Sequence, residues 1–175
     1  MSKNGEVVRK GGKSGKLWDE KTAAQDGAIG YWGDDERLYA MVVDGEGVKR
    51  YALDGKGGAA DIERLTGEQL GTFKKMMGGA MGKARGVAMD VDGDGREDYL
   101  VYGEGGMAML VNRGFGAYLV NPDVAEALKG GEMLKKGAVA TAGRRGGEKA
   151  EDLVMVTEEG GVLVAENPVR KGEEK

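Results

Sequence analysis

Short apolar runs, each closed by a glycine-rich or acidic turn, recur along most of this chain. Apolar runs of about four to eight residues between such turns are typical of buried β-strands. The pattern predicts strands at residues 28–32, 38–43, 48–53, 86–89, 99–102, 138–141, 153–156 and 162–165. Because the 34 glycines fall between these runs, they favour tight turns in a many-stranded all-β fold over a disordered chain.

The same order of features occurs three times: a strand, an acidic turn, a second strand, a glycine turn and a third strand. The turn at residues 103–105 repeats the sequence of the earlier turn at residues 45–47, Gly-Glu-Gly. The pair Glu151-Asp152 follows Glu97-Asp98 at a similar distance along the chain. A recurrence of about 50 to 60 residues predicts a repeat architecture.

Two short connecting helices are predicted where a repeat ends. Thr66 to Gln69 has the spacing of a capping box, and an apolar helical stripe that includes Phe73 and Met77 follows it. Asn121-Pro122 starts a second helix with proline at its first position. The step from Thr66 to Asn121 along the chain matches the period of the strands.

Composition narrows the chemistry that the fold can perform. The chain has no His and no Cys, and Ser occurs only at Ser2 and Ser14. These absences exclude a Cys or His zinc site, a thiol nucleophile and a serine hydrolase triad within the folded body. Carboxylates, Lys and Tyr remain, so a glycosidase-type pair of acids stays open on composition alone.

The charge of the chain is concentrated in one stretch. The net charge is -4, and residues 90–98 alone hold four Asp, one Glu and one Arg, which account for all of it. The remainder is close to neutral, which argues against a surface that binds nucleic acid or anionic membrane. There is no apolar run of about eighteen residues either, so no transmembrane helix is expected.

This acidic stretch, Asp90 to Asp98, reads Asp-Val-Asp-Gly-Asp-Gly-Arg-Glu-Asp. Its carboxylates alternate with glycines that let a short loop curl around one cation, and hard oxygen ligands of this number and charge suit calcium. An EF-hand would need a bidentate Glu at position 12, where Val101 stands, and helices on both sides. The flanking runs read as strands instead. We therefore expect a strand-to-strand turn that binds Ca²⁺, with Glu97 facing solvent.

From Gly86 to Asn121 the chain resembles the FG-GAP/VCBS repeat, which forms one blade of a β-propeller. The resemblance rests on the acidic loop, the apolar strand after it, the turn at residues 103–106, and the segment Asn112-Arg113-Gly114-Phe115-Gly116-Ala117-Tyr118. It implies calcium ligands from the side chains of Asp90, Asp92, Asp94 and Asp98 and from the carbonyl of Arg96. One complete site is expected, because the first copy keeps only Asp34, Asp35 and Glu36 and the third keeps only Asp152.

The blade template predicts how the chain is divided. The expected parts are a partial blade with terminal strands and a short helix at 21–27 (1–27), a blade with a degenerate acidic loop (28–79), a blade with the calcium loop (80–131), a partial blade (132–168) and a charged tail (169–175). About three four-stranded antiparallel blades cannot close a ring by themselves. We therefore expect part of a longer propeller, or copies that associate through edge strands such as residues 7–8 or 17–18 with residues 162–165.

Two classes of function follow from the resemblance. The first is a non-catalytic calcium-binding propeller module for adhesion, ligand recognition or scaffolding, with a protein or carbohydrate ligand, in an extracellular or periplasmic protein. No secretory signal pattern follows Met1, so this location rests on the resemblance. The second is an accessory or catalytic region of a carbohydrate-active enzyme, a polysaccharide lyase or glycosidase. A cleft with two carboxylates at glycosidase separation would favour the second class.

Overall fold

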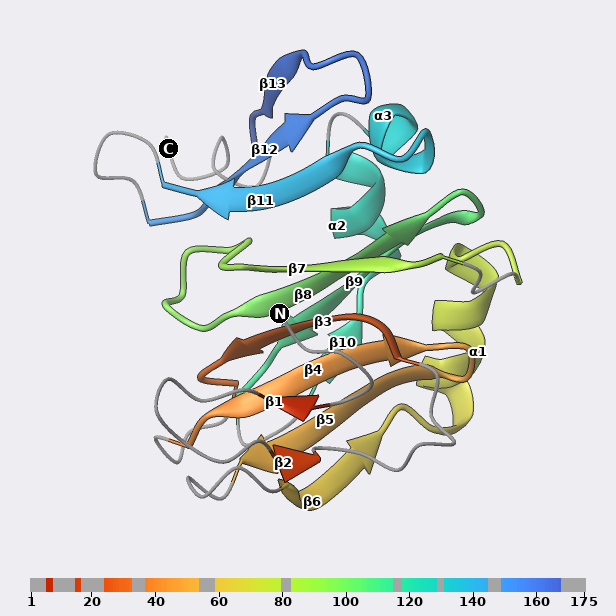
Figure 1. The fold of residues 1–175 in the computed structure, drawn as a ribbon, viewed down its shortest axis with the longest axis vertical. Helices are drawn as coiled ribbons and strands as arrows, with labels where there is room; N and C mark the ends of the chain where they lie inside the picture. Colours follow the sequence, from red (N-terminus) through yellow and green to blue (C-terminus); the bar gives the residue numbers. More distant parts are fainter. Residues whose placement is uncertain are drawn as a thin grey trace.

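The structure is a computed structural model and describes residues 6–7, 15–16, 24–32, 37–53, 59–79, 83–114, 118–128, 131–144 and 149–167. Within these residues every strand belongs to one of four antiparallel sheets, and three short helices connect or flank them (Figure 1). The predicted all-β class with few helices is confirmed. Among the described helices, none has the length and apolar character needed to cross a membrane.

Three larger sheets follow one another along the chain. The first sheet contains β3 (Ala24–Gly30), β4 (Tyr39–Asp44), β5 (Gly47–Leu53) and β6 (Ala59–Arg64). The second sheet contains β7 (Arg85–Met89), β8 (Asp98–Gly103), β9 (Gly106–Asn112) and β10 (Tyr118–Val120). The third sheet contains β11 (Val139–Gly143), β12 (Asp152–Val156) and β13 (Val162–Ala165). Strands in each sheet pair in chain order.

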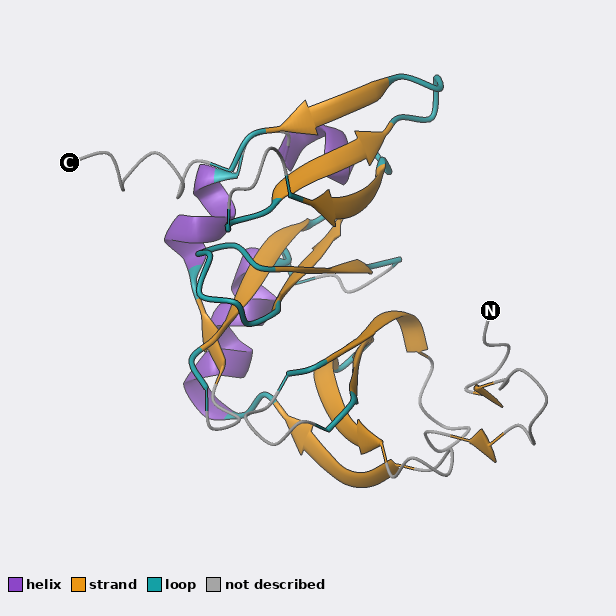
Figure 2. Cartoon of the chain, turned by 90° about the vertical axis from the view of Figure 1, so that its left-hand side faces the viewer, coloured by secondary structure: helices purple, strands orange, loops and turns teal. Residues whose placement is uncertain are grey.

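Smaller elements complete the described fold. An N-terminal pair, β1 (Glu6–Val7) and β2 (Gly15–Lys16), forms the fourth sheet. The helices are α1 (Gly67–Met76), α2 (Pro122–Ala127) and α3 (Gly131–Lys135), the last of which the sequence pattern did not predict. The first strands of the three larger sheets, β3, β7 and β11, lie side by side, and the sheets stack along the long axis of the molecule (Figures 1 and 2).

Two apolar cores hold the stack together. The first core lies between the first and second sheets and includes Trp32, Met41 and Tyr99. The second core lies between the second and third sheets and includes Leu100 and Leu153. Because both faces of the second sheet are covered, all six residues of β8 are buried. This explains why residues 99–102 form a continuous apolar run rather than an alternating one.

The helix predictions were correct in position and only partly correct in detail. The side chain of Asn121 accepts hydrogen bonds from the backbone N–H groups of Asp123 (3.1 Å) and Val124 (3.2 Å) and so caps α2, as expected. Thr66 stands at the N-cap of α1, but its side chain makes no capping hydrogen bond, so the predicted capping box is wrong. Phe73 is fully buried in the first core, which confirms the packing role of the apolar stripe.

The predicted helix at residues 21–27 is wrong for its described part, because residues 24–27 belong to strand β3. Tertiary hydrogen bonds override the local pattern here. The side-chain carbonyl of Gln25 accepts a hydrogen bond from the backbone N–H of Ala84 (2.6 Å), and the Asp26 carboxylate accepts one from Gly86 (3.0 Å). These polar side chains therefore join the first sheet to the second.

Candidate metal site and ligand pocket

The acidic loop connects β7 to β8, which confirms the predicted strand-to-strand turn. Carboxylate oxygens of Asp90, Asp92 and Asp98 lie within 4.8 Å of one another. Calcium binds oxygen ligands at about 2.3 to 2.6 Å, so oxygens on opposite sides of one ion are separated by about 5 Å. Three of the four predicted side-chain ligands are therefore already gathered at a distance that one calcium ion can span.

Backbone donors inside the loop hold the first carboxylate. Asp90 is buried, and its two oxygens accept hydrogen bonds from the N–H groups of Gly93 (2.8 Å) and Gly95 (3.0 Å). Both glycines have positive φ, +77° and +88°, as expected for a tight loop in which a side chain would be strained. These two glycines therefore allow the tight turn that brings the carboxylates together.

Asp98 is the most buried carboxylate of the cluster, with 1% of its surface exposed. Its oxygens accept hydrogen bonds from the backbone N–H groups of Val91 (2.8 Å) and Asn112 (2.7 Å). Burial raises the pKa of the Asp98 carboxyl to about 7, although both of these hydrogen bonds lower it. Burial, followed by the negative charge of Asp94, also raises the pKa of Asp92. A cation bound here would oppose both effects because it favours the ionised carboxylates.

Asp94 and Arg96 are placed differently from the other predicted ligands. One oxygen of Asp94 accepts a hydrogen bond from the backbone N–H of Arg96 (2.8 Å), and the other forms an ion pair with its guanidinium (2.9 Å). Asp94 is therefore outside the cluster of three and would have to turn from Arg96 to reach an ion. Its role as a ligand, and that of the Arg96 carbonyl, stay predictions.

The loop is also tied to the third sheet. Glu151 and Asp90 exchange two hydrogen bonds: the Glu151 N–H donates to the Asp90 carbonyl (2.8 Å), and the Glu151 carboxylate accepts from the Asp90 N–H (2.9 Å). The Arg144 guanidinium lies 3.3 Å from an Asp90 oxygen and 3.6 Å from a Glu151 oxygen. One positive side chain thus already offsets part of the negative charge of the loop.

Glu97 does not face solvent as expected; it is half-buried, and its Oε2 has no hydrogen-bond partner. That oxygen lies so close to Gly30 that an added Cβ there would be 1.9 Å from it. Burial, followed by the negative charge of Glu151, raises the pKa of Glu97.

The acidic residues of the first and third copies differ in whether the structure describes them. Asp34, Asp35 and Glu36 lie outside the described residues, whereas Asp152 is described and buried.

Two asparagines that the sequence pattern did not single out as structural contacts, one at the end of β9 and one just after β13, contact equivalent aspartates. Asn112 donates its backbone N–H to Asp98, and Asn167 donates its own to Asp152 (2.8 Å). The side-chain amide of Asn167 also donates to the carbonyls of Val91 (2.6 Å) and Glu151 (3.0 Å), which joins the third sheet to the acidic loop. The available signal was spacing, because each asparagine follows its aspartate at nearly the same distance along the chain.

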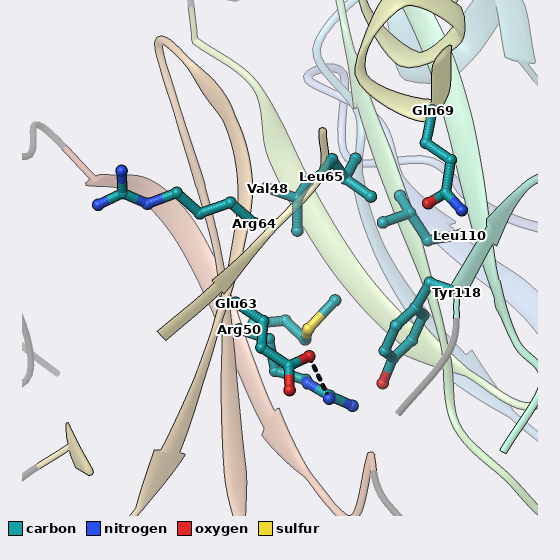
Figure 3. Close-up of a pocket in the computed structure, with 9 residues that line it drawn as sticks. Val48, Arg50, Glu63, Arg64, Leu65, Gln69, Leu110 and Tyr118 are labelled. Carbon is teal, nitrogen blue, oxygen red and sulfur yellow. Dashed lines mark hydrogen bonds and ion pairs between the residues drawn. The ribbon is translucent and has the colours of Figure 1, made fainter. Parts of the chain in front are cut away.

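A separate pocket of about 220 Å³ lies between the first and second sheets, beside the start of α1 (Figure 3). Side chains from β4, β5, β6, β9, β10 and the α1 region line it: Met41, Val48, Arg50, Glu63, Arg64, Leu65, Gln69, Leu110 and Tyr118. The lining combines apolar surface with amide, carboxylate, guanidinium and phenol groups.

Arg50 organises the polar side of this pocket. Its guanidinium pairs with Glu63, donates a hydrogen bond to the Trp32 carbonyl (3.1 Å), and lies 5.2 Å from the centre of the Tyr118 ring. The hydroxyl of Tyr118 donates to the same carbonyl (2.8 Å). Glu63 is the one carboxylate among the described lining residues, so the described part of the chain places no pair of acids at this pocket.

Comparison with known proteins gives a fold and no family. No family model matches the chain, and no curated protein matches it. Among solved structures, the chain is similar to a lectin of Agrocybe aegerita that recognises non-reducing terminal N-acetylglucosamine, with a TM-score of 0.57 and 16% sequence identity. The alignment covers 82% of this chain and 35% of the lectin, so the chain spans about a third of the lectin's length.

Proposed function

We propose that this chain is a non-catalytic, calcium-binding module that recognises a ligand, as an adhesion, recognition or scaffolding part of an extracytoplasmic protein. The observation that carries this proposal is the convergence of Asp90, Asp92 and Asp98 in the turn between β7 and β8. Calcium would neutralise these carboxylates and hold the turn. No His, Cys or Ser is present among residues 15–175 to use the ion in a reaction.

At the level of the fold, we propose that the larger sheets are blades of a β-propeller. Two of them have four antiparallel strands paired in chain order, and the third has three described strands in the same order. Their first strands lie next to one another, as the inner strands of neighbouring blades do (Figure 1). The likeness to the lectin supports an antiparallel β architecture of this kind.

For the ligand, we propose a carbohydrate bound in the pocket between the first and second sheets. The pocket has the mixture that a small sugar requires: polar groups from Glu63 and Gln69 for hydroxyls, and the apolar surface of Leu110 and the Tyr118 ring for the face of a pyranose (Figure 3). The similarity to an N-acetylglucosamine-recognising lectin supports the same class of ligand.

The enzyme alternative has less support. A glycosidase needs two carboxylates on opposite sides of the bond that is cleaved, separated by about 5 to 9.5 Å. The described lining of the pocket offers Glu63 alone, and that group is paired with Arg50. The lectin that shares the fold is a binding protein rather than an enzyme. These observations favour the non-catalytic reading.

Isothermal titration with N-acetylglucosamine and a panel of other monosaccharides tests the ligand assignment. We expect binding that Gln69→Ala weakens by about three- to tenfold, the loss of one neutral hydrogen bond. Tyr31→Ala is the matched control, because Tyr31 is exposed and does not line the pocket. Absence of binding by every sugar, or equal binding by Gln69→Ala, would contradict a carbohydrate site here.

A further inference from the structure

The outer face of the third sheet exposes a continuous set of apolar side chains. The register of β11, β12 and β13 places six residues in two rows across this face: Val139, Val156 and Val162 in one row, and Thr141, Val154 and Val164 in the other. The exposed fractions are 66% for Val162, 55% for Val164, 51% for Val139 and 46% for Val156. On the opposite face Leu153 and Met155 are buried in the second core, whereas Leu163, at the edge of the sheet, is 42% exposed.

The repeat shows what normally covers such a face. Asp152 and Asp98 begin β12 and β8, so Val154 and Val156 occupy the positions of Leu100 and Tyr102 in the second sheet. Leu100 and Tyr102 are 0% and 1% exposed because the third sheet packs against them. In the first sheet Met41 is likewise covered by the second sheet. The fold therefore buries this face under another antiparallel sheet wherever the repeat continues.

Among the described residues, the other end of the stack offers far less open apolar surface. The first sheet's face away from the second sheet carries Ala40, Val42 and Tyr51, which are only 3%, 2% and 1% exposed; on the same face Ile29, which pairs with Ala40, is 55% exposed. Head-to-tail stacking of copies would need this face to be free. A second copy can instead present the same face, the outer face of the third sheet, through a two-fold axis.

We propose that the outer face of the third sheet is a dimer interface, at which two copies of this chain pack these faces against each other. All six residues of the face are uncharged, so a two-fold axis brings no like charges together. Strand β13 has no charged residue, and among the described residues it pairs only with β12, so it lacks the charges that usually protect an edge strand. Five valines form the kind of β-branched surface that packs between two sheets about 10 Å apart.

Sedimentation analysis over a wide range of protein concentration tests this interface. We expect a dimer for the unmodified chain and a shift to monomer for Val164→Lys, whose dissociation constant should rise by about a hundredfold or more because each copy would bury an unpaired ammonium group. Val162→Lys provides a second variant at the most exposed position of the face. Circular dichroism establishes that each variant keeps its β-sheet content.

The control is Leu119→Lys, because Leu119 is 43% exposed on β10 and lies outside the third sheet. This variant should remain dimeric. A monomer at every concentration, or a dimer that neither lysine on β13 weakens, would overturn the interface. The calcium response of the melting temperature is measured in parallel, and it should persist in the monomeric variants because no residue of the acidic loop is changed.

Discussion

At the scale of single residues, Asp92 is the sharpest probe of the acidic loop. Asp90 and Asp98 are buried and also hold the backbone together, whereas Asp92 is half-buried and accepts one hydrogen bond, from the N–H of Asp94 (3.2 Å). Removing its carboxylate should therefore affect metal binding more than folding. We expect Asp92→Ala to abolish any rise in melting temperature caused by calcium while the calcium-free melting temperature changes little.

Glu104→Ala is the control for this prediction. Glu104 is an exposed carboxylate in the turn at the opposite end of β8, so it tests whether removal of any acidic residue has the same effect. Differential scanning fluorimetry with calcium and with chelator measures both variants. A calcium response retained in Asp92→Ala, or lost equally in Glu104→Ala, would be inconsistent with the proposed ligand set.

The pKa of Asp98 gives a second prediction at this scale. Burial raises this pKa from 3.8 to about 7, so the folded chain holds the proton more tightly than the unfolded chain does. Without metal, the contribution of Asp98 to stability is therefore greatest below pH 3.8 and is lost as the pH rises through about 7. Calcium requires the ionised group, so its affinity should fall as the pH drops below about 7.

Melting temperatures measured against pH, with chelator and with calcium, check this sign. The unmodified chain with chelator should lose stability between pH 5 and 7 relative to Asp98→Asn, whose side chain does not titrate; this interval lies between the two pKa values, 3.8 and about 7. With saturating calcium the loss should disappear. Parallel pH curves for the two proteins in chelator would show that Asp98 is not perturbed by burial.

At the scale of the elements, the asparagine contacts connect one sheet to the next. The side-chain amide of Asn167 donates to the carbonyl of Val91 in the acidic loop (2.6 Å) and to that of Glu151, just before β12 (3.0 Å). Asn167→Ala would leave two buried acceptors without these donors, and we expect it to lower the free energy of unfolding by about 1–3 kcal/mol. Chemical denaturation measures the change.

Asn121→Ala provides the comparison for Asn167→Ala. The Asn121 side chain also hydrogen-bonds to the backbone, but it accepts from N–H groups within a single element, at the start of α2. Loss of such a cap costs about 1 kcal/mol. If Asn167→Ala lowers the free energy of unfolding no more than Asn121→Ala does, the Asn167 contacts do not hold the two sheets together as proposed.

The strands were predictable from sequence because each lies in a short apolar run between turns. The segments at 99–102 and 153–156, for example, fall inside β8 and β12. The acidic loop was predictable too, because its carboxylates and glycines all lie within residues 90–98 of the sequence. Residues 24–27 were not, because their strand structure depends on hydrogen bonds to residues far along the chain, in and just before β7.

The environments of single side chains were also hard to predict. Glu97 was expected in solvent because it lies in a polar loop, yet neighbouring sheets enclose it next to Gly30. Asp94 was expected beside the other ligands, but the nearby Arg96 guanidinium engages it. The position of Glu97 depends on Gly30, which the tertiary structure brings near, whereas the Asp94–Arg96 pair is a local contact that the motif does not distinguish from a metal ligand.

At the scale of the whole molecule, stability comes from contacts between sheets. The second sheet shares one core with the first sheet and another with the third, so its central strands, β8 and β9, are buried on both faces. The acidic loop lies at the junction of the second and third sheets, where Glu151, Arg144 and Asn167 all contact it. A bound ion at this position would therefore stabilise the packing of the two sheets as well as the turn.

We propose that this loop binds calcium and thereby stabilises the fold. If the affinity is like that of extracellular calcium modules, with a dissociation constant of about 10⁻⁴ to 10⁻³ M, then calcium at about ten times that constant adds about 1.4 kcal/mol to the free energy of unfolding. For a chain of this size that corresponds to a rise in melting temperature of about 3–6 °C. The direct measurement is the melting temperature of the unmodified chain in calcium and in chelator. We expect a rise in calcium that chelator reverses; a melting temperature that is the same in both would show that the loop does not stabilise the fold by binding calcium.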